Sequence, residues 1–243
     1  MVILLDKIFN MAGLDSFTKL LLHCNGTNAS TSFPDSSLSP KTVTANGGAI
    51  VSTAQSKFGG ASLLINNASA DYLSAPDSDD WFFDTGAWTI DMWVYRTTDS
   101  GTDEVLIDNR GTTATVGWVL FINSSDVLDS YMGGALRGNS GATTIPLNTW
   151  THVAYVRTGD TMKIFINGTQ QGGDYSFSAS YSIPDAAGGT PLLRVGIRQD
   201  NLSGFRGHMD EIRVSKGIAR WTANFTPPTI EYGNDGGFLL NFL

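Results

Sequence analysis

The stretch NTWTHVAYVRTGDTMKIFING (residues 148–168) combines strand and turn signals in a short space. Two runs rich in β-branched and aromatic residues, at 151–157 and 162–167, flank a Thr-Gly-Asp turn. The Asn-Gly pair that ends the stretch is a strong two-residue turn signal and leads into another short strand. The stretch therefore predicts an antiparallel meander.

The segment WTIDMWVY (88–95) shows the clearest alternation of apolar and polar residues. One face is apolar and consists of Trp88, Ile90, Met92 and Val94. The other face is mixed and consists of Thr89, Asp91, Trp93 and Tyr95. A half-polar face with aromatic rings is typical of a sugar-binding groove, although strands of a sandwich also use aromatic residues for ordinary packing.

Further short strands are predicted wherever apolar runs end at Gly, Asp, Asn or Pro. They are expected at 19–23, 61–65, 72–75, 104–109, 117–123, 192–198 and 208–215. About a dozen short strands indicate two packed sheets. Two long polar connections, 133–146 and 176–191, are natural places for function on a rigid scaffold.

Composition narrows the classes of partner. The chain has 243 residues, a formal net charge of −8 and no cluster of Lys and Arg, which argues against nucleic-acid binding. No stretch approaches the roughly 20 apolar residues that span a bilayer, and we predict no membrane partner. The first 16 residues contain no recognisable secretory signal. The single cysteine, Cys24, is predicted to be a buried thiol.

Several phrases occur in a characteristic order. They are FTKLLLHCNGTN (17–28), KFGGASLLINNASADYLSAPDS (57–78) and FRGHMDEIRVSKGIARW (205–221), together with the two stretches above. This pattern resembles the laminin-G-like, concanavalin-A-like lectin family, in a form found in bacteriophage decoration and tail proteins. The resemblance implies an all-β, two-sheet antiparallel jelly-roll sandwich over 17–227, with the first and last strands side by side. An amphipathic arm (1–16) and a Gly-Gly hinge with an apolar tail (228–243) complete the predicted organisation.

Many members of this superfamily hold a structural calcium ion near the paired terminal strands. Transferred here, the ligands are the side chain of Asp210 and carbonyl groups near Asn25 and Gly60. The family usually has Asp where this chain has Asn25, and one carboxylate makes a modest site for an ion that prefers six to eight oxygen atoms. The alternative is that Asp210 caps a turn. No other cofactor is predicted.

The resemblance includes glycanases, which need a close pair of carboxylates, commonly within an E-x-D-x-x-E phrase. The chain lacks that phrase and has three glutamates, Glu104, Glu211 and Glu231. Its three histidines, at 23, 152 and 208, are scattered in predicted strands without metal-ligand spacing. We therefore predict no catalytic residues and no enzymatic activity.

These observations predict a non-catalytic virion structural protein, made and assembled in a host cytoplasm, that displays a lectin-like jelly roll with weak affinity for host glycans. It is expected to associate with itself and with other virion proteins. The predicted assembly residues are Leu4, Leu5, Ile8, Phe9, Phe238, Leu239, Leu240 and Phe242, unless both ends pack back onto the same domain. The predicted glycan-stacking residues are Trp93, Tyr95, Trp118, Tyr131 and Tyr181. The alternative function is a dedicated carbohydrate-binding adhesin that uses calcium.

Overall fold

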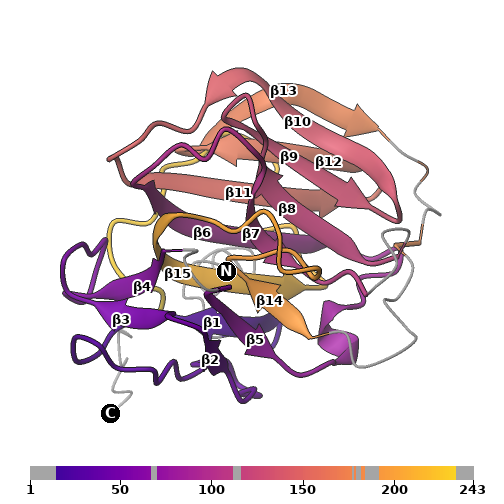
Figure 1. Cartoon of the computed structure of the whole chain (residues 1–243). Helices are drawn as coiled ribbons and strands as arrows, with labels where there is room; N and C mark the ends of the chain where they lie inside the picture. Colours follow the sequence, from indigo (N-terminus) through magenta and orange to yellow (C-terminus); the bar gives the residue numbers. More distant parts are fainter. Residues whose placement is uncertain are drawn as a thin grey trace, which may run out of the picture.

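The computed structural model describes residues 15–66, 70–111, 116–176, 178, 182–183 and 192–233. Within them the chain forms two antiparallel sheets that pack face to face (Figure 1). Sheet A has the order β13 (Thr169–Ser176), β12 (Thr161–Ile166), β11 (Thr151–Thr158), β6 (Trp88–Arg96), β15 (Gly207–Lys216), β4 (Ser62–Ile65) and β3 (Ile50–Ser52), with β1 (Thr18–Leu22) also paired to β15. Sheet B has the order β10 (Ala135–Thr144), β9 (Val127–Met132), β8 (Trp118–Ile122), β7 (Glu104–Asp108), β14 (Leu193–Val195), β5 (Tyr72–Ala75) and β2 (Thr44–Asn46). The predicted all-β jelly-roll sandwich is confirmed.

The core lies between the two sheets and is built from alternate residues of each strand. In β6 the four apolar residues of the predicted apolar face are all buried in it. Phe83 fills the centre, because its ring stacks on Trp88 of sheet A and on Trp118 of sheet B, each at 5.2 Å between centroids. A short 3-10 helix, η1 (Asp79–Trp81), precedes it and buries the indole of Trp81. The aromatic residues thus join the sheets directly.

The predicted meander and the predicted pairing of the terminal strands are both confirmed. Strands β11, β12 and β13 follow one another in the chain and pair in that order. The first strand, β1, pairs antiparallel with the last strand, β15. Sequence-distant ends of the domain are therefore fixed to each other by backbone hydrogen bonds.

One predicted connection is mostly a strand. The polar segment 133–146 was expected to be a loop, but β10 occupies Ala135–Thr144 and pairs with β9. Its ladder contains irregularities near Gly138 and Asn139, which accommodate residues that rarely occur in strands. Strand β10 is the edge strand of sheet B, and it lies next to β13 of sheet A.

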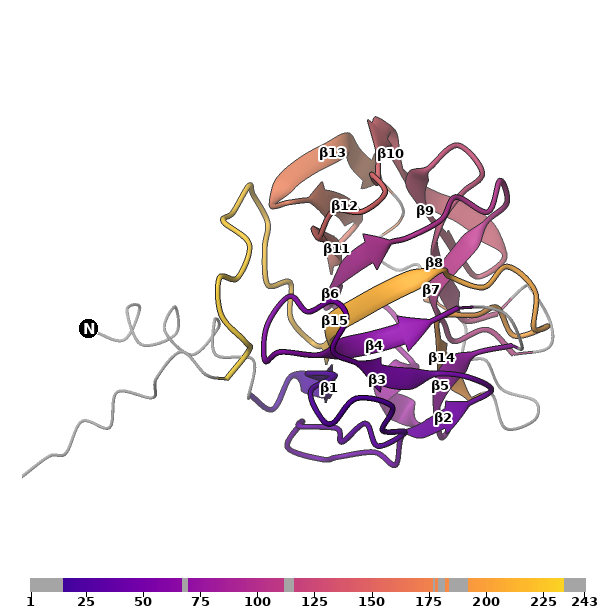
Figure 2. The same ribbon diagram turned by 60° about the vertical axis from the view of Figure 1, so that its left-hand side comes forward.

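The segment 217–233 runs across the outward face of sheet A (Figure 2, yellow). Trp221 and Phe225 stack on each other at 4.0 Å and pack against Phe165 and His152. Tyr232 is buried on the same face, where its hydroxyl donates to the carboxylate of Asp91. The outward face of sheet A is therefore covered by the chain itself.

Among the described residues no helix has the length and apolar character needed to cross a membrane. The predicted assembly residues, in 1–14 and 234–243, lie outside the described residues, as does Tyr181. Their predicted roles stay predictions.

Candidate functional site

Sheet B has a second apolar surface, which faces away from the core. Every other side chain of β8 joins the main core, whereas Val119 and Phe121 point the other way. They form a separate cluster with Val105 of β7. A β-bulge between Val105 and Ile107 lets both Leu106 and Ile107 reach the core while Val105 stays outside it.

A shallow hollow of about 50 Å³ opens on this surface. We call it the sheet-B hollow, and it is lined by Asp103, Val105, Arg110, Val119, Phe121, Tyr131 and Arg198. Its floor consists of the three apolar side chains, and its polar groups stand at the edge. The residues come from β7, β8 and β9, from the loop that precedes β7 and from the loops that follow β7 and β14.

Tyr131 forms one wall of the hollow. Its ring stacks on Phe121 with centroids 5.7 Å apart and planes 17° from parallel. Tyr131 is nevertheless 38% exposed, because it lies on the outward face of β9 directly opposite Val119 of β8. An aromatic ring held by a second ring and open to solvent is a surface on which the CH face of a sugar can stack.

Two arginines stand at the opposite edge, each fixed by an aspartate. The Nε and Nη2 atoms of Arg110 donate to the two oxygen atoms of the buried Asp108 at 3.0 and 2.9 Å. Nε of Arg198 donates to both oxygen atoms of Asp200 at 2.9 and 3.0 Å. Arg198 thereby lowers the pKa of Asp200. The Nη1 atom of each guanidinium has no hydrogen-bond partner among the residues that the structure describes, and can donate to a ligand.

A row of polar side chains continues along the same face beside Phe121. Asp129 lies opposite Phe121 in the β8–β9 ladder. Its Oδ2 accepts from the amides of Asn123 and Asn139 at 3.1 and 3.2 Å. Burial raises the pKa of Asp129. The face therefore combines an aromatic platform with groups that donate and accept hydrogen bonds, as small-molecule sites generally do.

The structure does not bring the predicted stacking residues together. Tyr131 is at the hollow, whereas Trp93 and Tyr95 are on the outward face of sheet A. Trp93 is only 5% exposed, because Lys57 and Phe58 cover its ring. Tyr95 is half-buried against Trp150 and His208.

The prediction that Trp118 stacks on a glycan is wrong. Its side chain is fully buried in the core, and its indole N–H donates to the carbonyl oxygen of Trp81 at 2.9 Å. A ring in this position cannot stack on a glycan. Phe121, which the sequence reasoning missed, occupies the outward face instead. Alternation from Trp118 places Phe121 on the opposite face, but a continuous apolar run does not indicate which face is which.

Asp210 does not form the implied calcium site with Asn25 and Gly60. Its Oδ2 accepts from the backbone N–H groups of Lys57 and Phe58, and its Oδ1 accepts from that of Glu211. Three N–H groups directed at a carboxylate occupy the position that a cation would need. Burial raises the pKa of Asp210 to about 7, and no group of three or more His, Cys, Asp or Glu residues in the described part of the chain could hold a metal ion.

Nδ2 of Asn25 donates to Oε1 of Glu231, while its buried Oδ1 has no hydrogen-bond partner among the described residues. One unpaired amide oxygen does not replace the carboxylate of Asp210, whose two oxygen atoms are engaged by backbone N–H groups, so the residues do not fit a calcium ion. Asp210 instead fixes the turn at 57–58 to β15, as the alternative interpretation of this residue held.

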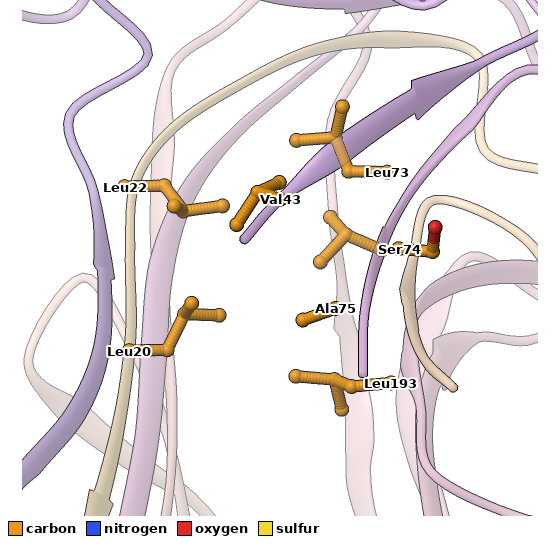
Figure 3. A pocket seen from close by; sticks show the side chains of 8 residues that line it. Leu20, Leu22, Val43, Leu73, Ser74, Ala75 and Leu193 are labelled. Atoms are coloured by element: carbon orange, nitrogen blue, oxygen red, sulfur yellow. The ribbon is translucent and has the colours of Figure 1, made fainter. Parts of the chain in front are cut away.

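A second gap lies inside the sandwich rather than on its surface (Figure 3). It is lined by Leu20, Leu22, Val43, Leu73, Ser74, Ala75, Leu193 and Val195. The labelled apolar side chains face one another across the gap, whereas the hydroxyl of Ser74 points away from it (Figure 3). It has no space for a water molecule. It is a packing gap, and the sheet-B hollow remains the candidate ligand site.

The fold and the outward aromatic platform define a lectin-like β-sandwich. The model of the Concanavalin A-like lectin/glucanases superfamily matches residues 67–220, and the chain belongs to this superfamily. Comparison with curated protein sequences gives no match.

Solved structures of clostridial toxin domains share the fold. The binding domain of Paraclostridial Mosquitocidal Protein 1 aligns with a TM-score of 0.62 and 17% identity over 84% of this chain and 50% of that chain. Botulinum neurotoxin type C, whose cell entry depends on interaction with two ganglioside molecules, aligns with a TM-score of 0.58 and 11% identity over 88% of this chain and 50% of that chain. The binding domain of botulinum neurotoxin DC in complex with rat synaptotagmin II aligns with a TM-score of 0.57 and 12% identity over 84% of this chain and 49% of that chain. The chain thus spans about half the length of these proteins.

Proposed function

We propose that this chain is a non-catalytic glycan-binding module that uses the outward face of sheet B. The observation that carries the proposal is the exposed ring of Tyr131, which is stacked on Phe121 beside a hollow edged by Arg110, Arg198 and Asp103. An aromatic platform supplies affinity for the CH face of a sugar, and convergent polar groups supply orientation.

Membership of a superfamily of lectins and glucanases supports the proposal, and so does the ganglioside dependence of botulinum neurotoxin type C. The toxins carry less weight, because low identity indicates a shared fold and about half of each toxin chain has no counterpart here. The proposal therefore rests on the sheet-B hollow.

The direct test is binding to an array of immobilised glycans, followed by calorimetry with each glycan that is retained. Tyr131→Ala is expected to weaken binding at least about fivefold, since stacking on an aromatic ring contributes roughly 1 kcal/mol or more. Tyr131→Phe keeps the ring and is expected to bind within about twofold of the wild type, because a twofold change is less than 1 kcal/mol.

Phe17→Ala is the matched control, because it removes an equally exposed aromatic ring (40%) near β1 and β15 of sheet A. Binding that is unaffected by Tyr131→Ala, or no binding to any glycan, would contradict the proposal. Hydrolysis of a bound glycan would contradict its non-catalytic part.

The virion role, self-association and assembly in a host cytoplasm remain part of the proposed function. They are supported by sequence phrases that resemble those of bacteriophage virion proteins, including LLLHCNGTN and STAQSKFGGASL. In this proposal the arm and the tail attach the module to a particle, and the sandwich presents its glycan-binding face.

A further inference from the structure

The floor of the sheet-B hollow offers a ligand no hydrogen bond. Val105, Val119 and Phe121 are apolar, and their strands are paired on both sides, so their backbone groups are engaged in the ladders. A sugar hydroxyl placed on this floor would lose its water without gaining a partner. The group that fills the hollow must therefore be apolar at its tip.

The volume of the hollow limits the size of that group. About 50 Å³ is small beside the roughly 300–1,000 Å³ of ordinary ligand pockets, so the hollow takes only part of a sugar. A substituent of a sugar can enter, while the ring itself stays outside against Tyr131. A methyl group carried on a short polar linker has the required size and polarity.

The edge of the hollow determines what the linker must be. Nη1 of Arg110 and Nη1 of Arg198 are donors that have no hydrogen-bond partner among the described residues. The carboxylate of Asp103 likewise accepts no hydrogen bond from any described residue, although it lines the hollow. The linker should therefore contain one acceptor and one donor next to the methyl group.

An acetamido group has these three parts. Its methyl group can rest on the apolar floor, its carbonyl oxygen can accept from an arginine, and its N–H can donate to Asp103. A 6-deoxy sugar carries a methyl group too, but that methyl group is bonded directly to the ring. No planar linker with an acceptor and a donor separates it from the ring, so the ring would have to enter the hollow with it.

The charges around the hollow disfavour an acidic sugar. Arg110 and Arg198 are paired with Asp108 and Asp200, and Asp103 adds a further negative charge. The positive charges are thus more than balanced, and a ligand carboxylate would be repelled by Asp103. The ligand should be uncharged.

Resting on the proposed glycan-binding function, we propose that the sheet-B hollow binds the acetamido group of an uncharged N-acetylated sugar, while the ring of that sugar stacks on Tyr131. Arg110, Arg198 and Asp103 then determine specificity, and Tyr131 supplies much of the affinity.

The test uses the full chain and matched pairs of immobilised glycosides that differ only in the acetamido group. The pairs are N-acetylglucosamine with glucose, N-acetylgalactosamine with galactose, and N-acetylmannosamine with mannose, beside fucose, rhamnose and N-acetylneuraminic acid. The N-acetylated member of at least one pair is expected to bind about tenfold or more tightly, since loss of a well-fitted group costs this much.

Variants identify the hollow as the origin of the preference. Asp103→Ala and Val119→Leu are expected to reduce the preference within the pair to less than about threefold, while both stay folded, as thermal unfolding can check. Arg198→Gln is an independent third variant. Asp77→Ala, at an exposed aspartate outside the hollow, is expected to keep the full preference.

The outcomes separate the two proposals. Equal binding of both members of every pair, or a preference for a 6-deoxy sugar, overturns the acetamido inference and leaves glycan binding intact. A preference for N-acetylneuraminic acid, which also carries an acetamido group, overturns the statement that the ligand is uncharged. A preference for N-acetylated sugars that survives both Asp103→Ala and Val119→Leu also overturns it. Failure to bind any glycan overturns both proposals.

Discussion

Asp91 shows how a single residue attaches the segment 217–233 to sheet A. The carboxylate is fully buried and accepts from Nε and Nη2 of Arg213 at 2.9 and 3.2 Å and from the hydroxyl of Tyr232. Burial by itself would raise the pKa of Asp91, but Arg213 and His152 outweigh it and lower the pKa to about 2. The ion pair therefore persists across the ordinary range of pH.

We predict that Asp91→Asn lowers the free energy of unfolding by about 3–5 kcal/mol, because it leaves the charge of Arg213 buried without a partner. Denaturant unfolding at pH 7 measures this difference. The control Asp174→Asn removes the exposed partner of Lys163 and should have no measurable effect.

The difference in the free energy of unfolding between the wild type and Asp91→Asn should also depend on pH. The folded pKa of Asp91 is below the unfolded value of about 3.9, so its contribution is complete above that value and is lost as pH falls toward 2. The gap between wild type and Asp91→Asn should therefore be smaller at pH 3 than at pH 7. An equal gap at both values would contradict the assigned pKa.

At the scale of residues, the sequence predicted the faces of β6 but not the site. Strict alternation at 88–95 separates apolar from polar positions, and the structure follows it. The run WVLFI (118–122) contains no polar residue, so its two faces could not be told apart. Arg110 and Arg198 lie in loops, whose direction depends on tertiary contacts that no local pattern encodes.

The turn of the β12–β13 hairpin, Asn167-Gly168, contacts the segment 217–233. Asn167 and Gly168 both have positive φ, at 48° and 76°, as a type I′ turn requires. Gly168 also accepts a hydrogen bond from the backbone N–H of Phe225, and a Cβ at Gly168 would collide with the carbonyl oxygen of Phe225. The turn thus holds the segment 217–233 in place.

We predict that Gly168→Ala lowers the free energy of unfolding by about 2 kcal/mol or more, because it adds backbone strain of roughly 1–2 kcal/mol to a steric clash. Gly173→Ala is the matched control, since Gly173 has a similar φ of 81° and open space around its Cβ position. Thermal and denaturant unfolding of both variants measure the difference. Equal losses would mean that the Phe225 contact contributes nothing.

Strand β10 shows where prediction from pattern fails at the scale of elements. Its sequence, ALRGNSGATT, is rich in Gly, Asn and Ser, which locally favour turns. It becomes a strand because β9 supplies partners between Ala135 and Asn139 and again at Thr144. Pairing between strands outweighed local preference, which is common for β-structure.

At the scale of the whole molecule, the apolar tail remains the strongest candidate for self-association. We predict that the full chain forms an oligomer and that the double variant Leu239→Asp, Leu240→Asp shifts it toward monomer, because two charges oppose burial of the tail. Size-exclusion chromatography with light scattering measures the mass. Ile230→Asp adds a charge at an exposed apolar residue outside the tail and should leave the mass unchanged.

A monomeric wild-type chain would contradict the prediction. So would an oligomer that persists in the double variant.

The covered face of sheet A has a consequence for how the module is presented. Arg220, in the covering segment, donates to Asp15, and the same segment brings Glu231 to Asn25 and Tyr232 to Asp91. The first and last described residues are therefore held on the sheet-A side, whereas the hollow opens from sheet B. A support attached through residue 15 or 233 therefore lies on the sheet-A side of the sandwich. The sheet-B hollow then points away from that support. Many such copies on one support could engage a glycan-coated surface together, so that individually weak contacts add up to firm adhesion.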